Sequence, residues 1–247
     1  MPARRQGGLF VKIRSGHPFY GQEIGILVNA SAAPRVPGDA GHAATFAYPV
    51  RYQVTGTSFM DLVEGSDETR EKILAACRAL REAGVRGIVA DCGLMSLYQA
   101  EVARAVGLPF VGSSLCQIPL VWQLAGRQGA IGVLTGHSDF LRPAHLRNSG
   151  WDPSIPLSIQ GMECQLHFAE VVIHGGGTLD VERMRQDVLR AARALREKTP
   201  ELRAVILECS NLATYSRDVA QCLEVPVFDA VSAANLLHYG LEPPRYL

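Results

Sequence analysis

Two cysteines stand at matching places in two stretches of the sequence that repeat each other. Cys92 lies in GIVADCGLMSLYQAEVARAVGLPFV, and Cys209 lies in AVILECSNLATYSRDVAQCLEVPVF. They are 117 positions apart (209 minus 92), and distinctive residues coincide at the same offset: Tyr98 with Tyr215, Pro109 with Pro226, and Asp91 with Glu208. Two unrelated amphipathic segments would match in apolar character, but rarely in Cys, Tyr and Pro as well. The sequence therefore predicts an internal duplication in which each copy carries one thiol.

A pair of thiols on opposite sides of one bound molecule can move protons by itself. An unperturbed cysteine has a pKa of about 8.5, so one thiolate and one thiol can coexist near neutral pH. The thiolate can remove a proton from one side of a carbon atom while the thiol supplies a proton to the other side. Backbone N–H groups that hold a carboxylate would stabilise the negative charge that develops. We therefore predict that Cys92 and Cys209 are catalytic and invert a carbon next to a carboxylate, with no metal ion and no cofactor.

Short apolar runs alternate with amphipathic segments along the chain. This order is typical of α/β folds, in which helices connect parallel strands. We predict strands at 23–30, 49–55, 86–90, 108–112, 129–136, 156–161, 203–208 and 225–229. We predict helices at 66–84, 94–107, 114–126, 178–200, 212–224 and 230–240, with a loop and a short helix at 138–150.

The repeat divides the chain into two lobes. We expect residues 1–113 plus 227–247 to form the first lobe and residues 114–226 the second. The predicted fold is α/β, with two pseudo-twofold-related lobes, each a parallel sheet flanked by helices, and the active site in the cleft between them. Ligands bind at the carboxyl ends of the strands in such sheets. Each cysteine follows a strand there and precedes a helix, where backbone N–H groups favour a thiolate or a bound carboxylate.

Small and polar residues stand at neighbouring strand ends of the predicted cleft. Asn29 ends the first strand, and Thr135 with Gly136 ends its repeat. Ser210 and Asn211 follow the second cysteine, and their side chains suit both the capping of the next helix and the binding of a carboxylate. The predicted substrate-binding residues are Asn29, Gly93, Thr135, Gly136, Ser210, Asn211, Ser113 and Ser114.

Other polar residues near these positions are expected to play no direct part. Asp91 and Glu208 precede the cysteines, and side-chain alternation along a strand turns them away from the side that the cysteines face. Arg35 lies in a loop rich in Pro and Gly and is expected to be solvated. The histidines lack the spacing of zinc ligands, although His137 is the one nearest to the predicted cleft. The remaining cysteines are expected to pack within the structure: Cys77, Cys116, Cys164 and Cys222.

The overall composition narrows the function classes. Lys plus Arg and Asp plus Glu both number 24, so the chain lacks the basic excess of most nucleic-acid-binding proteins. No apolar stretch reaches about 18 residues, and the first 21 residues lack the apolar core of a secretory signal. The six cysteines are therefore expected to be free thiols of a cytoplasmic protein. We expect an enzyme for a small-molecule carboxylate that binds neither nucleic acid nor membranes.

Four motifs give the chain a resemblance to the aspartate/glutamate/hydantoin racemase superfamily. They are IGILVN in the first strand, ADCG around Cys92, VLTG at 133–136 and ECSNL around Cys209. The PGDAG loop at 37–41 and the SSLCQIPL segment at 113–120 are similar to the Asp/Glu racemase family proteins. The resemblance implies two α/β lobes with the active site between them, proton transfer by paired cysteines without a cofactor, and a homo-oligomer.

The motifs also depart from those of glutamate racemases. Residues 92–94 read Cys-Gly-Leu and residues 209–211 read Cys-Ser-Asn, where glutamate racemases carry Cys-Asn-Thr and Cys-Thr-His. Residues 29–31 read Asn-Ala-Ser in place of Asp-Ser-Gly. Glutamate is therefore not the expected substrate. Because the segment after the second cysteine is the more polar one, we expect the substrate carboxylate to lie nearer to Cys209.

Three functions follow from these observations. The first is a cofactor-independent racemase or epimerase acting on an amino acid or a related small acid. The second keeps the fold but uses one cysteine, as in maleate isomerase-like or arylmalonate decarboxylase-like members, and unequal effects of replacing Cys92 and Cys209 would reveal it. The third is a carboxylate-binding protein without turnover, and the presence of both cysteines argues against it.

Overall fold

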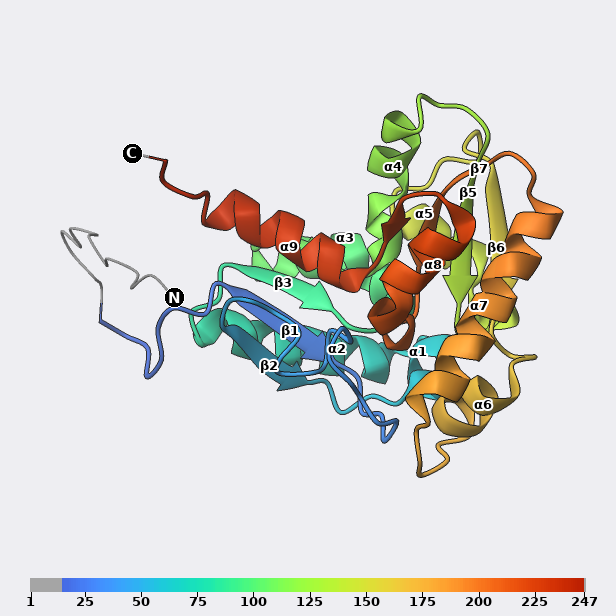
Figure 1. The fold of residues 1–247 in the computed structure, drawn as a ribbon. Helices are drawn as coiled ribbons and strands as arrows, with labels where there is room; N and C mark the ends of the chain where they lie inside the picture. The colour runs from blue at the N-terminus through green and yellow to red at the C-terminus, as the bar shows by residue number, and fades with distance from the viewer. Residues whose placement is uncertain (1–14, 247) are drawn as a thin grey trace.

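The chain forms two lobes, each built on a four-stranded parallel sheet (Figure 1). The computed structural model describes residues 15–246, so most of the segment tested for a secretory signal lies outside the described residues. The first sheet contains β1 (Ile24–Val28), β2 (Val50–Val54), β3 (Gly87–Ala90) and β4 (Phe110–Val111). The second sheet contains β5 (Ala130–Thr135), β6 (Leu157–Gly161), β7 (Leu202–Leu207) and β8 (Val227–Phe228). The predicted fold class is confirmed.

The two sheets have the same topology. Their strand orders are β2-β1-β3-β4 and β6-β5-β7-β8, so the first strand of each lobe lies second in its sheet. The register also corresponds: Ile24 of β1 lies opposite Gly87 of β3, and Ile131 of β5 lies opposite Ala204 of β7, which is 117 positions after Gly87. Cys92 and Cys209 therefore follow equivalent strands, as an internal duplication would require.

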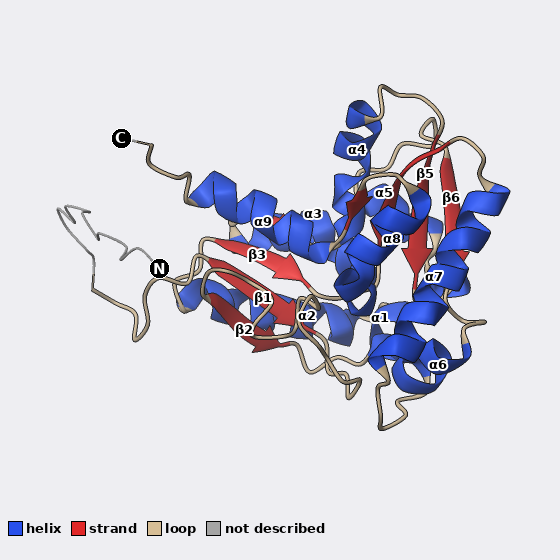
Figure 2. Cartoon of the chain, viewed as in Figure 1, coloured by secondary structure: helices blue, strands red, loops and turns tan. Residues whose placement is uncertain are grey.

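Helices cover both faces of each sheet (Figure 2). The α-helices are α1 (Phe59–Glu64), α2 (Asp67–Glu82), α3 (Gln99–Val106), α4 (Ile118–Leu124), α5 (Pro143–Asn148), α6 (Leu166–Phe168), α7 (Val181–Lys198), α8 (Ser216–Leu223) and α9 (Ala230–Leu241). Short 3₁₀-helices form η1 (Gly93–Tyr98), η2 (Ser114–Gln117), η3 (Ser138–Phe140) and η5 (Ser210–Tyr215), and η4 (Ala169–Ile173) is a π-helical turn.

The longer helices begin and pack as their sequences predict. Ser66 caps α2 by accepting a hydrogen bond from the backbone N–H of Thr69, and Ile73, Cys77 and Leu80 are buried along one face of that helix. Capping satisfies a backbone donor at the helix start, and the apolar stripe binds the helix to the sheet. Asp180 caps α7 in the same way.

Each sheet separates two apolar cores. In the first lobe, α2 and α3 pack on one face and α9 on the other, where Ala230 and Ala234 share a buried cluster with Ile24 and Val89. In the second lobe, α7 and α8 pack on one face and α4 and α5 on the other. The chain returns to the first lobe only after β8, which pairs with β7 in the second sheet, so residues 227–228 belong to the second lobe rather than to the first.

The structure differs from the predicted elements mainly at short turns. The segments after the two cysteines begin as 3₁₀ turns, η1 and η5, before α3 and α8 start. The helices α1 and α6 were not predicted, because segments of 6 and 3 residues are too short to show a helical repeat. Both short helices lie beside the junction of the lobes and supply side chains to the site described below.

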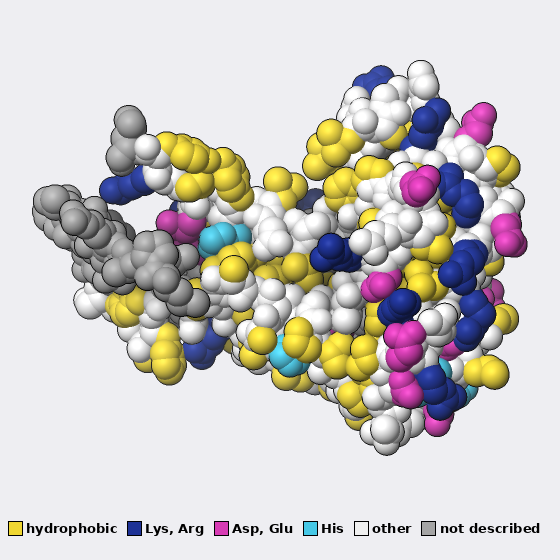
Figure 3. All heavy atoms as spheres, viewed as in Figure 1, with side chains coloured by type: hydrophobic (Ala, Val, Ile, Leu, Met, Phe, Trp, Pro, Cys, Tyr) yellow, Lys and Arg dark blue, Asp and Glu magenta, His cyan; other side chains and the backbone are white. Residues whose placement is uncertain are grey.

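The surface combines charged and apolar regions (Figure 3). Lys, Arg, Asp and Glu side chains cover the outer face of the second lobe, whereas hydrophobic side chains gather over α9 and face α4 across a notch. Leu124 and Leu236 are among the exposed residues of these two helices. Among the described helices, none combines the length and the apolar character that a membrane span requires.

Candidate active site

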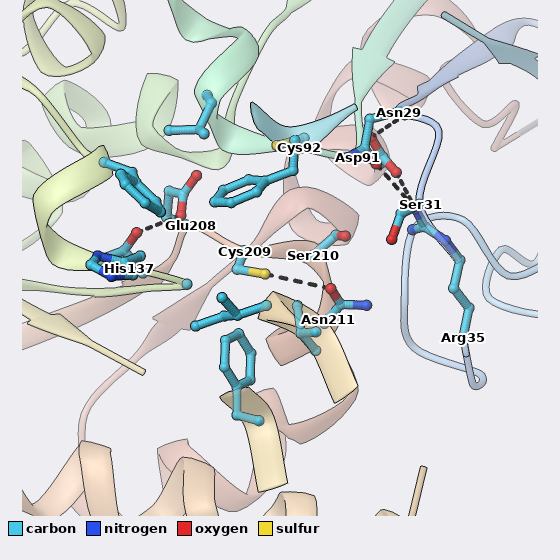
Figure 4. A pocket seen from close by; sticks show the side chains of 18 residues that line it. Asn29, Ser31, Arg35, Asp91, Cys92, His137, Glu208, Cys209, Ser210 and Asn211 are labelled. Atoms are coloured by element: carbon cyan, nitrogen blue, oxygen red, sulfur yellow. Dashed lines mark hydrogen bonds and ion pairs between the residues drawn. The ribbon is translucent and has the colours of Figure 1, made fainter. Parts of the chain in front are cut away.

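A cavity opens between the lobes where the carboxyl ends of β1, β3, β5 and β7 meet (Figure 4). The space inside it, including the open solvent at its mouth, is about 620 Å³. Both predicted catalytic cysteines, Cys92 and Cys209, line it. The position at the strand ends agrees with the general rule for open α/β sheets.

The two cysteines are symmetrically arranged. Their backbones form an isolated antiparallel pairing, Cys92 with Cys209, that joins the lobes at the cavity. The backbone N–H of Leu94 donates to the sulfur of Cys92, and the N–H of Asn211, 117 positions later, donates to the sulfur of Cys209. The Cys209 thiol also donates to Oδ1 of Asn211 at 3.6 Å. Each sulfur is thus held by a donor two residues further along the chain.

The electrostatic surroundings of the two thiols are unequal. Burial raises the pKa of both Cys92 and Cys209 well above the ordinary range, and the negative charge of Glu208 raises both further. Besides Glu208, the negative charge of Asp91 raises the pKa of Cys92; at Cys209 the negative charge of Asp39 raises the pKa and the Arg35 guanidinium lowers it by a smaller amount. Of the two thiols, Cys209 is therefore the one with a cation acting on it.

Arg35 is an unexpected member of the site. It donates from Nη2 to Oδ2 of Asp91 at 2.6 Å and from Nη1 to Oδ1 of Asp39 at 2.7 Å. Asp91 also accepts a hydrogen bond from the backbone N–H of Asn29. Burial raises the pKa of Asp91 to about 6, although Arg35 and Asn29 favour its charged form. The expectation of a solvated loop arginine is therefore wrong, because the loop folds back over the strand ends and buries the guanidinium.

Glu208 occupies the equivalent place in the second lobe. Its Oε2 accepts from the hydroxyl of Thr135 at 2.7 Å, and the backbone N–H of Gly136 also donates to the carboxylate. Burial raises its pKa. Both Asp91 and Glu208 line the cavity, so the prediction that they point away is wrong. The strands β3 and β7 end at Ala90 and Leu207, one residue earlier, and strand alternation no longer applies to the carboxylates.

The PGDAG loop closes the site by contacts with the other lobe. Oδ2 of Asp39 accepts from Nδ2 of Asn211 at 3.0 Å, and the Thr214 hydroxyl donates to the carbonyl of Pro37 at 3.2 Å. Gly38 lies so close to Thr214 that an added Cβ would come within 2.7 Å of its Cα. Asp39 thus connects Arg35 of the first lobe to Asn211 of the second.

The structure brings most of the predicted substrate-binding residues together. The predicted residues that line the cavity are Asn29, Thr135, Gly136, Ser210 and Asn211. Gly93 does not line it and instead lies beneath the side chain of Glu208. Ser113 and Ser114 also lie outside its lining: the Ser113 side chain accepts from the N–H of Leu115, and Ser114 donates to the carbonyl of Leu207 at 2.8 Å. The Ser113 hydroxyl caps the turn that follows it, and the Ser114 hydroxyl joins η2 to the end of β7.

Aromatic side chains from short elements form an apolar wall that sequence analysis missed. The rings of Phe59 and Phe140 meet edge to face with centroids 5.3 Å apart, and His137 stacks on Phe140 at 4.1 Å. Phe168 also lines the cavity. Of these residues, only His137 could be related to the cleft beforehand, because it follows the VLTG strand end.

The other cysteines lie away from this cavity. Cys77 is buried, and Cys222 packs against the core of the second lobe, as predicted. Cys116 is half-buried and donates to Oε1 of Gln99 at 3.3 Å. Cys164 is exposed, so the expectation that it packs is wrong. Within residues 15–246, no group of three or more His, Cys, Asp or Glu side chains is arranged to hold a metal ion.

Comparison with solved structures identifies the fold. Unliganded arylmalonate decarboxylase superposes with a TM-score of 0.56 at 16% identity, covering 91% of this chain and 94% of that one. Allantoin racemase from Klebsiella pneumoniae superposes with a TM-score of 0.55 at 20% identity, covering 89% of this chain and 87% of that one. The predicted resemblance to the racemase superfamily is thus confirmed for the fold.

Comparison with curated proteins gives relatives of a different activity. Dimethylsulfoniopropionate lyase 6 of Emiliania huxleyi is 29% identical over 257 aligned positions, covering 99% of this chain but 65% of that protein. A dimethylsulfoniopropionate lyase of Durusdinium sp. clade D is 30% identical over 221 positions, covering 85% of this chain and 72% of that protein. The chain therefore spans about two thirds of the length of these relatives.

The sequence relatives refine the prediction made from the motifs. No family model matches the chain. The relatives are lyases, so an isomerase subtype is not supported by them. At 30% identity over 72% of its relative, this chain belongs to the protein family of the dimethylsulfoniopropionate lyases, built on a fold that allantoin racemase and arylmalonate decarboxylase share.

Proposed function

We propose that this protein is a lyase that splits dimethylsulfoniopropionate, or a closely similar β-onium carboxylate, into dimethyl sulfide and acrylate. Family membership supports the substrate. The observation that carries the reaction is the presence of two thiols, Cys92 and Cys209, in one cavity at the junction of the lobes. Racemisation and β-elimination both begin with removal of a proton next to a carboxylate, so a thiol base suits either reaction.

The elimination is balanced without a further reactant. A cysteine thiolate takes a proton from the carbon next to the carboxylate. The electron pair of that C–H bond forms the carbon–carbon double bond, and the bond between the β-carbon and the positively charged sulfur breaks. Dimethyl sulfide leaves as a neutral molecule with the bonding pair, acrylate keeps the carboxylate, and the thiol later releases its proton to water.

Cys209 is the proposed base. The N–H of Asn211 donates to its sulfur and the Arg35 guanidinium acts on it, although the charge of Asp39 opposes the thiolate; Cys92 has the N–H of Leu94 and no cation acting on it. A base must be deprotonated before it can accept the substrate proton, and a cation beside the thiol favours that state, so Cys209 is the better candidate.

The substrate carboxylate is placed beside the same residues. During proton removal, negative charge moves onto the carboxylate, and nearby donors lower the energy of that state. Ser210, Asn211 and Arg35 are the polar donors on the Cys209 side of the cavity. This arrangement supports the expectation, made from the sequence, that the carboxylate lies nearer to the second cysteine.

The test is release of dimethyl sulfide from dimethylsulfoniopropionate, measured in the headspace above the purified protein. We expect turnover by the wild type and a loss of about 100-fold or more for Cys209→Ser, the usual range for removal of a general base. Cys92→Ser should retain a substantial share of the activity. Cys164→Ser, which alters an exposed thiol outside the cavity, is the matched control. No release by the wild type, or equal loss in both cavity variants, contradicts the proposal.

A racemase or epimerase is the second candidate, favoured by the symmetric placement of Cys92 and Cys209 across the cavity. Inversion needs a base on one side of the carbon and an acid on the other, so both thiols would be indispensable. NMR spectra of a panel of small carboxylates in deuterated water would then show loss of the α-proton signal. Exchange that requires both cysteines, without release of dimethyl sulfide, identifies this alternative.

A further inference from the structure

The cavity carries an excess of negative charge that proton removal alone does not require. Among the described residues that line it, Asp91 and Glu208 are acidic, and Arg35 is the permanent cation. Arg35 already forms ion pairs with two carboxylates, Asp91 and the buried Asp39. Glu208 makes its contacts to Thr135 and Gly136 and forms no ion pair with a described residue. A substrate with only negative charge would be repelled from this cavity.

The charges are separated in space. Figure 4 places Asp91, Asn29 and Arg35 on one side of the two cysteines and Glu208 with His137 on the other side. Glu208 is 4% exposed, so its carboxylate is largely shielded from water. The cavity therefore has an end with a paired arginine and an end with an uncompensated carboxylate.

The aromatic wall belongs to the Glu208 end. His137 directly follows Gly136, whose N–H donates to Glu208, and His137 stacks on Phe140. Phe59 contacts Phe140 edge to face, and the ring of Phe168 lies 3.7 Å from the position of an added Cβ on Gly136. An acidic group and several aromatic rings are thus gathered at one end of a small cavity.

This combination matches a methylated onium group. Sulfonium and quaternary ammonium groups spread their charge over methyl groups, are weakly hydrated and bind to aromatic faces. A primary ammonium group is more strongly hydrated and would lose its water against an apolar wall. A neutral alkyl group would leave the buried Glu208 charge uncompensated.

We propose that Glu208, with Phe59 and Phe140, recognises the methylated onium group of a zwitterionic substrate whose carboxylate lies on the Arg35 side. This inference rests on the proposed function and assigns the specificity of the same cavity. In this orientation the carbon next to the carboxylate lies between the two ends, beside the thiols. The onium charge also offsets the Glu208 charge, which raises the pKa of both cysteines when the cavity is empty. Substrate binding therefore favours formation of the catalytic thiolate.

The experiment compares two carboxylates of the same shape and different charge by isothermal titration calorimetry. They are 3-(trimethylammonio)propionate and 4,4-dimethylpentanoate, in which carbon replaces the ammonium nitrogen. We expect the wild type to bind the ammonium compound at least about tenfold more tightly. Glu208→Gln should reduce that preference to within about twofold while keeping the affinity for the neutral acid. Glu163→Gln removes a carboxylate of the same lobe outside the cavity lining and should keep the wild-type preference.

Equal binding of the two acids by the wild type overturns the proposal, as does an unchanged preference in Glu208→Gln. If Glu208→Gln fails to fold, Phe140→Leu is measured instead. We expect Phe140→Leu to reduce the preference for the ammonium compound by about threefold. An unchanged preference in Phe140→Leu also overturns the proposal. The binding preference is measured without turnover. A wild type that prefers the onium acid but releases no dimethyl sulfide contradicts the lyase, whereas release without an onium preference contradicts this assignment of Glu208.

Discussion

Glu208 of the second lobe lies directly over the α-carbon of Gly93 in the first lobe: a Cβ built on Gly93 would come within 2.6 Å of Cδ of Glu208. The carboxylate is held from its other side by Thr135. The two segments that carry the cysteines thus meet through a glycine and a glutamate, and each constrains the place of the other.

Replacing Gly93 by Ala should therefore disturb both stability and the site. Overpacking of a close contact costs about 1–3 kcal/mol of unfolding free energy. Urea unfolding should show this loss, and combining Gly93→Ala with Glu208→Ala should recover most of it because the clashing atoms are removed. Gly177→Ala, where an added Cβ meets nothing within 4 Å, is the control. Equal stability of the Gly93 and Gly177 variants would show that Glu208 moves freely.

The ion pairs of Arg35 should contribute to stability as well as to the site. Arg35→Met leaves Asp91 and Asp39 buried without their cation, and breaking a buried pair in this way costs about 3–5 kcal/mol. Arg86→Met is the comparison, because Arg86 is half exposed in its pair with Glu23 and should cost about 1 kcal/mol or less. Urea unfolding at neutral pH measures both. Similar losses for the two variants would argue against a structural role of the Arg35 pairs.

His145 should make stability depend on pH. Burial, helped by the charge of Arg142, lowers its pKa to about 4 in the folded protein, below the ordinary value of about 6.5. Between these values the unfolded chain binds the proton more tightly, so stability falls as the pH is lowered from 6.5 to 4, by up to about 1.4 kcal/mol per pH unit.

His145→Asn should remove this contribution, because the amide cannot gain a proton while its oxygen can still accept from the N–H of Arg142. Chemical unfolding of the wild type and the variant at several pH values measures the difference in slope. Parallel curves over this range would mean that His145 is protonated in the folded state as readily as in the unfolded state.

Glu208→Gln should make the cavity thiols more acidic. The negative charge of Glu208 raises the pKa of Cys92 and Cys209, so its removal stabilises both thiolates. Alkylation by iodoacetamide, followed by mass spectrometry of the cysteine-containing peptides, should therefore reach its half-maximal rate at a lower pH than in the wild type. The profile of Cys164 serves as an internal reference in each sample. A shift to higher pH would mean that Glu208 assists thiol ionisation.

The sequence patterns predict the architecture well because the lobes are built from regular units. Strands such as β1 and β7 are buried on both faces, so each appears as an apolar run, and α2 and α7 have clear caps and apolar stripes. The repeat then places Cys92 and Cys209 at equivalent strand ends. Because the equivalent strands of the two sheets end at the junction of the lobes, the repeat also accounts for the presence of both cysteines in one cavity.

The remaining site residues depend on contacts that no local pattern encodes. Arg35 meets Asp91 across 56 positions of chain, and only the folding of an irregular loop brings the two together. The side chains of Phe59, Phe140 and Phe168 come from elements of 6, 3 and 3 residues, which have no detectable period. The reaction type is equally hidden, because a thiol beside an acidic carbon suits isomerisation and elimination alike.

The antiparallel pairing of Cys92 with Cys209 has a consequence for motion. Two equivalent residues that pair with each other straddle the axis that relates the lobes. A rotation of one lobe against the other about this axis would move each residue in proportion to its distance from the axis. The cysteines on the axis move least. Such a rotation would therefore change the separation of the two cysteines less than that of residues farther from the axis.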